Sequence, residues 1–94
     1  MRTYLIETYL PRSRVAELEV RAADLRAAVL ELRQAGARIR YVRSTFLPED
    51  ETCFHVVEGS SLRVVHTAIA HAKLAADRIS EAVDEQGEPA TNAP

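Results

Sequence analysis

The alternation of apolar and polar residues along this chain predicts two kinds of element. Four segments alternate with a period of two, which is typical of strands: residues 3–9, 38–47, 52–58 and 78–84. In two other segments apolar residues recur at steps of three and four, which predicts helices. The two helical stripes are Val15, Leu18, Ala22, Leu25, Val29 and Leu32, and then Leu62, Val65, Ile69 and Ala72.

The stretch from Arg38 to Glu58 reads as a β-hairpin. Pro48 presets a turn between its two strands, and the acids that follow keep the tip solvated. Strict alternation then separates two faces of the hairpin. One face carries Tyr41, Arg43, Thr45, Cys53, His55 and Val57, and the more apolar one carries Val42, Ser44, Phe46, Phe54 and Val56. We expect the more apolar face to lie against the helices, and the first face to carry any chemistry.

The predicted order βαββαβ defines an α+β fold of the ferredoxin-like class. Its four-stranded antiparallel sheet has the strand order fourth, first, third, second, with both helices on one face. Ser13 is the expected N-cap of the first helix, and Gly36 the left-handed residue after its end. The open face is expected to carry Leu5, Tyr9, Tyr41, Val57, Ile79 and Val83. We therefore expect a homodimer packed face to face, which would enclose a shared cavity or an α+β barrel.

Length and composition narrow the class of protein. The 94 residues contain one Cys and three His, which predicts one domain over residues 1–84 without a disulfide framework or a zinc ribbon. Residues 85–94 offer almost nothing apolar to bury and are predicted to be a disordered tail. The chain shows no signal peptide or membrane-spanning pattern, so we expect a cytoplasmic protein without a membrane partner. A net charge of -2 gives no reason to expect nucleic-acid binding.

Three separated segments carry a resemblance to a known family. They are Tyr4–Glu7, the hairpin sequence RYVRSTFLPEDETCFH at residues 40–55, and Asp77–Val83. Over residues 3–84 the chain resembles the small actinobacterial family called domain of unknown function 4242. The resemblance implies a ferredoxin-like dimer and nickel binding, with no ligand assigned to a residue. The chain departs from the family at Lys73 and Ala75, where relatives typically have Gly and Pro, and the shape of that turn is left open.

On the expected strand order, one polar residue of each strand falls at neighbouring positions of the open face. These residues are Glu7, Arg43, His55 and Glu81. Glu7, His55 and Glu81 could ligate nickel or another divalent cation, since imidazole suits nickel and carboxylates add negative charge. The same four residues could instead catalyse acid–base chemistry, with His55 titrating near neutrality, or form an ion-pair network that fixes the register of the dimer.

Three further residues are candidates to line the cavity or bind a ligand: Tyr9, Tyr41 and Cys53. Three functions therefore stay open at this point. The first is a ligand- or metal-binding protein, with nickel as the expected ion. The second is a cofactor-independent enzyme that acts on a small aromatic or polyketide-like substrate. The third is a structural interaction module.

Overall fold

The computed structural model describes residues 1–85, 87 and 88, so most of the predicted tail lies outside the described residues. In chain order the elements are β1 (Arg2–Tyr9), the short 3-10 helix η1 (Arg12–Arg14), α1 (Glu17–Gln34), β2 (Ile39–Leu47), β3 (Thr52–Gly59), α2 (Leu62–Ala72) and β4 (Arg78–Ala82). The strands form one antiparallel sheet in the order β2-β3-β1-β4. The predicted ferredoxin-like α+β fold and its strand order are confirmed.

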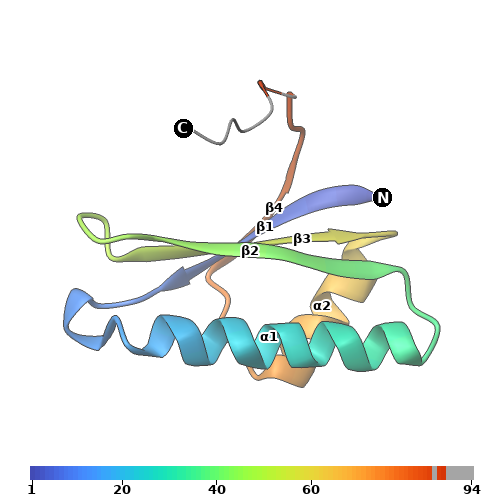
Figure 1. Cartoon of the computed structure of the whole chain (residues 1–94), viewed down its shortest axis with the longest axis horizontal. Coiled ribbons are helices and arrows are strands. Elements are labelled where there is room, and N and C mark those ends of the chain that lie inside the picture. Colours follow the sequence, from blue (N-terminus) through green and yellow to red (C-terminus); the bar gives the residue numbers. More distant parts are fainter. Residues whose placement is uncertain (86, 89–94) are drawn as a thin grey trace, which may run out of the picture.

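Both helices cover the same face of the sheet, as Figure 1 shows. The core forms where their apolar stripes meet the strands. Leu25 and Val29 from α1 and Val65 from α2 are buried there. The strand residues packed against them include Tyr4, Ile6, Ile39 and Val57. Since burying one such side chain contributes about 1.5–3 kcal/mol, this layer supplies most of the driving force for the fold.

The predicted assignment of the hairpin faces is wrong for β3 and for Tyr41, whereas the register of β2 from Arg43 to Phe46 agrees with it. Cys53, His55 and Val57 are buried on the helix-covered face, whereas they were expected on the open one. Tyr41 and Ile79 also pack against the core, so they leave the predicted open face. Phe54 and Val56 alternate with Cys53, His55 and Val57 along β3, so they point to the open side instead.

A β-bulge in β2 explains part of this reversal. Tyr41 is opposite Val57 and Arg43 is opposite Val56, so Val42 is an extra residue in β2. An extra residue shifts the alternation of every side chain that follows it. Tyr41 and Ser44 consequently point to the same, helix-covered side, although strict alternation would separate them.

The helix ends are set by local hydrogen bonds. Gly36 has a φ of 100 and donates to the carbonyl of Arg33 (3.0 Å), which confirms the predicted left-handed exit from α1. Lys73 takes the same position after α2, with a φ of 54 and a bond to the carbonyl of Ala70 (3.2 Å). The turn at which the chain departs from the family pattern therefore keeps a left-handed residue, at the steric cost that a side chain adds there.

The predicted N-cap of the first helix is wrong. Ser13 falls within η1, and Ala16 is the N-cap of α1, without a side-chain hydrogen bond. Ser61 does cap α2, because its hydroxyl group accepts from the backbone N–H of Val64 (3.4 Å). The N-terminal end of α1 is therefore left to other contacts, among them the ion pair between Arg14 and Glu17.

Candidate functional site

The residues predicted to form one polar cluster lie apart. His55 is fully buried on the helix-covered face, opposite Ile6 of β1. Glu7 is the next residue of β1 and therefore points to the open face, opposite Arg78 of β4. The sheet itself separates the two side chains, because neighbouring residues of a strand point to opposite faces.

The other two members of that cluster lie at the edges of the sheet. Glu81 is in the edge strand β4, where its carboxylate is 3.7 Å from the guanidinium of Arg2. Arg43 is exposed on the other edge strand, β2. In the part of the chain that the structure describes, no three side chains of His, Cys, Asp or Glu are grouped so that they could hold a metal ion. The residues Glu7, His55 and Glu81 therefore do not fit a nickel site within one copy of the chain.

A cleft lies between the first half of α1 and the bulged part of β2. Its volume is about 570 Å³. An apolar wall is formed mainly by Val15, Leu18, Ala22 and Val42. Two smaller hollows border the open face: one of about 90 Å³ beside Leu5 and Phe54, and one of about 260 Å³ beside Glu7, Tyr9 and Thr52. The α1–β2 cleft therefore offers more room for a ligand than either hollow at the sheet face, where the cavity was expected.

The cleft has one guanidinium group, on Arg26, and one carboxylate, on Glu19. Arg43 also borders the cleft, but it is opposite Val56 in the strand register, so its side chain points toward the open face. The guanidinium of Arg26 lies over the ring of Tyr41, 5.1 Å from its centroid, which is within the range of a cation–π contact. This contact holds the arginine over the tyrosine ring, and both residues line the cleft.

Behind the cleft, polar side chains continue into the core. The hydroxyl oxygens of Tyr41 and Ser44 are 2.6 Å apart, and Ser44 Oγ is 2.6 Å from Nδ1 of His55. Nε2 of the same imidazole is 3.5 Å from Sγ of Cys53. Both ring nitrogens of this fully buried histidine therefore have partners, which offsets the cost of its burial.

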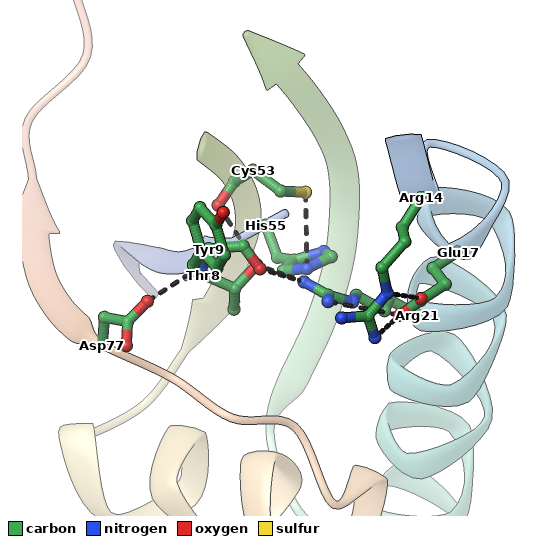
Figure 2. Close-up of polar contacts among 8 residues, drawn as sticks. All are labelled: Thr8, Tyr9, Arg14, Glu17, Arg21, Cys53, His55 and Asp77. Carbon is green, nitrogen blue, oxygen red and sulfur yellow. Dashed lines mark hydrogen bonds and ion pairs between the residues drawn. The ribbon is translucent and has the colours of Figure 1, made fainter. Parts of the chain in front are cut away.

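His55 stays neutral near pH 7. Its pKa is lowered to about 4, first because burial disfavours the imidazolium ion and then because the Arg21 cation lies nearby. Arg21 is held there by the carbonyl of Tyr9 (2.7 Å) and the hydroxyl group of Thr8 (3.3 Å), as Figure 2 shows. Protonating His55 therefore costs about 3 kcal/mol more than protonating an ordinary histidine. The predicted titration near neutrality is wrong, and His55 is a weak general base.

Cys53 is also inert in this setting. The thiol is fully buried beside His55, and burial raises its pKa, so the reactive thiolate is disfavoured. Tyr9, the other outlying candidate, is largely exposed at the end of β1, where its backbone N–H donates to Asp77 (2.9 Å; Figure 2). Of the three predicted ligand-binding residues, only Tyr41 lines the cleft; Cys53 lies behind it and Tyr9 lies elsewhere.

The sequence did not single out Ser44 or the α1 residues Glu19 and Arg26. Strict alternation placed Ser44 among apolar residues, and neither Glu19 nor Arg26 belongs to the apolar stripe of the first helix. One signal in the sequence does indicate the bulge. The arginines occupy even positions at Arg38 and Arg40 and then change to an odd position at Arg43. A change of parity among exposed charges within one strand is what an extra residue produces.

Comparisons of the chain with family models, with curated proteins and with solved structures found no match. The resemblance to domain of unknown function 4242 therefore stays a prediction from the three segments described above. In the described residues, no helix has both the length and the hydropathy that crossing a membrane requires.

Proposed function

We propose that this protein binds a small organic acid in the cleft between α1 and β2. The observation that carries the proposal is a hollow of about 570 Å³ in which an apolar wall faces the guanidinium of Arg26 and two hydroxyl groups, on Tyr41 and Ser44. Small-molecule sites commonly have volumes of roughly 300–1,000 Å³ and combine apolar walls with a few convergent polar groups. Guanidinium groups suit carboxylates because they offer paired donors and a fixed charge.

The shape of the polar end favours a planar acid. The guanidinium of Arg26 lies over the ring of Tyr41, and a flat aromatic or unsaturated group could stack on the outer side of this planar cation. The apolar side chains of Leu18, Ala22 and Val42 suit the hydrocarbon part of such a ligand. A cofactor-independent enzyme that acts on a small aromatic or polyketide-like substrate is the second candidate. What favours it is the pair of hydroxyl groups, on Tyr41 and Ser44, at the inner wall of the cleft.

Binding can be tested with four carboxylates, benzoate, phenylacetate, cinnamate and hexanoate, each paired with the corresponding primary alcohol. In amide NMR spectra of the untagged protein, carboxylates are expected to shift resonances of residues 15–26 and 41–44. Replacement of Arg26 by Met should weaken carboxylate binding roughly tenfold or more, since it removes a charged hydrogen-bond donor. Arg33→Met is the matched control, because Arg33 is an exposed arginine of α1 outside the cleft. Equal binding of acids and alcohols, or shifts confined to the open face, would count against the proposal.

A second copy of the chain is the proposed partner of the open face. Leu5, Phe54 and Val56 form an apolar centre there, with the ion pair between Arg40 and Glu58 beside it on the same face. A sheet face with an apolar centre and a charged rim is typical of a contact between subunits. This homodimer would leave the α1–β2 cleft accessible, because the cleft is on the helix side of the sheet. Nickel binding, which the resemblance implies, finds no support in how Glu7, His55 and Glu81 are placed in one chain.

A further inference from the structure

The hydrogen-bonded chain behind the cleft has one accessible end and one buried end. Tyr41 and Ser44 line the cleft, whereas His55 and Cys53 are fully buried. The three contacts along the chain are 2.6, 2.6 and 3.5 Å long. A ligand in the cleft therefore meets this chain at a hydroxyl group whose hydrogen bonds depend on a neutral imidazole deeper in the core.

The bulge is what assembles this chain. Residues three positions apart in a regular strand point to opposite faces, so Tyr41 and Ser44 could not meet without an extra residue between them. Val42 is that residue, and after it the side chain of Ser44 returns to the side of Tyr41 and His55. Bulges interrupt strand pairing and are common beside functional sites, where they re-aim a side chain.

The hydrogen bonds that join Tyr41, Ser44 and His55 can run in two directions. The two directions differ in whether the hydroxyl hydrogen of Tyr41 is available to a ligand. If His55 carries its hydrogen on Nε2, Ser44 donates to Nδ1 and accepts from Tyr41, so the tyrosine hydrogen is used within the chain. If the hydrogen is on Nδ1, the imidazole donates to Ser44, Ser44 donates to Tyr41, and the tyrosine hydrogen is free for a ligand. A carboxylate has acceptors only, so it requires the second direction.

We propose that Tyr41 is a specificity-determining residue for the acid group of the ligand, and that Ser44 and His55 position its hydroxyl group as a donor. This inference rests on the proposed binding of an organic acid. The acid selects the Nδ1–H form of His55, and no charge is buried in the change because the imidazole is neutral in both forms. Arg26 then supplies the second contact to the acid from across the tyrosine ring.

The experiment uses the tightest-binding carboxylate of the four-member panel. Long-range nitrogen–proton NMR spectra of His55 are expected to show Nδ1 protonated in the complex. Tyr41→Phe should weaken binding of the carboxylate roughly ten- to a hundredfold, since one charge-assisted hydrogen bond is lost, and weaken the matched alcohol much less. With Ser44→Ala, the carboxylate should no longer alter the His55 spectrum. Tyr4→Phe is the matched control, because Tyr4 has a buried hydroxyl group outside the cleft and without a partner in the described residues.

Two kinds of result would overturn this inference, and they are distinguishable. If Tyr41→Phe keeps its affinity, or if His55 carries its hydrogen on Nε2 in the complex, while Arg26→Met still weakens binding, the role of Tyr41 is refuted and the proposed function stands. If the wild-type protein binds none of the four carboxylates, both the proposed function and this inference are refuted.

Discussion

The two faces of the sheet use polar residues in opposite ways. On the helix-covered face, polar groups are few and buried, and His55 is held between Ser44 and Cys53. On the open face, charged residues such as Arg40 and Glu58 pair at the surface, around an apolar centre in which Leu5 and Phe54 are half-buried and Val56 is buried. The covered face thus forms both the core and the inner wall of a cleft. The open face is the surface for which we propose a contact with a second copy of the chain.

The difference between the faces is one of structural constraint. A charged pair on an exposed sheet face is worth about 0–1 kcal/mol and is screened by salt. A buried histidine in a hydrogen-bonded chain must instead keep every partner, because an unsatisfied buried group costs about 1–3 kcal/mol. The constrained residues are therefore on the covered face, where the bulge brings them to the edge of the cleft.

The largest expected effect is a difference in unfolding free energy between a charged substitution on the covered face and one on the open face. Val57 is fully buried among the core residues, so Val57→Asp places an unpaired carboxylate in the core and should destabilise the fold by about 3–5 kcal/mol or prevent folding. Leu5 is half-buried on the open face, so Leu5→Asp should change the unfolding free energy of the monomer by less than about 1 kcal/mol. Urea unfolding of both variants and the wild type measures these differences.

The same pair of variants tests the proposed homodimer. In sedimentation experiments the wild type is expected to be a dimer. The Leu5→Asp variant is expected to be folded but shifted toward monomer. A dimer that Leu5→Asp leaves unaffected would mean that the open face is not the interface. Leu5→Ala is the matched control, because it shortens the side chain without adding a charge.

The sequence predicted the architecture well because periodicity reports which elements form. The steps of three and four placed Leu25 and Val29 in the core, and the alternating segments became β1 to β4 in the expected order. Proline and acids at residues 48–51 were a sufficient signal for the hairpin turn. These features depend on local preferences and on the burial of one apolar face, which a single sequence records.

The candidate site could not be predicted in the same way, because it depends on the face of the sheet to which each side chain points. One extra residue, Val42, moves Ser44 to the side of Tyr41, and one error of face in β3 turned His55 outward in the prediction. Arg26 was missed for a different reason. From sequence alone, a charged residue on a helix is assigned to the solvent-exposed face unless the neighbouring strand is known. Here the neighbouring strand is β2, and Arg26 contacts its residue Tyr41.

The next effect concerns pH and acts on the covered face only. Because the folded pKa of His55 is about 4 and its ordinary value is 6.5, the unfolded chain takes up the proton first as the pH falls. The stability that neutral His55 contributes is therefore complete above pH 6.5 and is lost between pH 6.5 and 4, by about 3 kcal/mol in total. Urea unfolding at several pH values should show this loss in the wild-type protein.

His55→Asn is the comparison that isolates this effect. The variant should be less stable than the wild type at pH 7, because ring contacts are lost, and the gap should narrow as the pH falls. His66 and His71 are exposed and present in both proteins, so their contributions cancel. Parallel pH profiles for the two proteins would show that His55 does not change its protonation on unfolding.

The smallest expected effect is on nickel binding. It tests whether the three residues that the sequence analysis grouped into one site lie on different parts of the sheet. Glu7 is on the open face, His55 on the covered face, and Glu81 in an edge strand beside Arg2. Nickel can be titrated by calorimetry into the untagged wild type and into Glu7→Gln, His55→Asn and Glu81→Gln. Because a shared ion needs its ligands within about 2–2.2 Å of one point, the three variants are expected to show no common loss of binding. If all three lost the same binding event, these residues would have to meet in an assembly of copies, and the division into two faces would not describe how the protein binds metal.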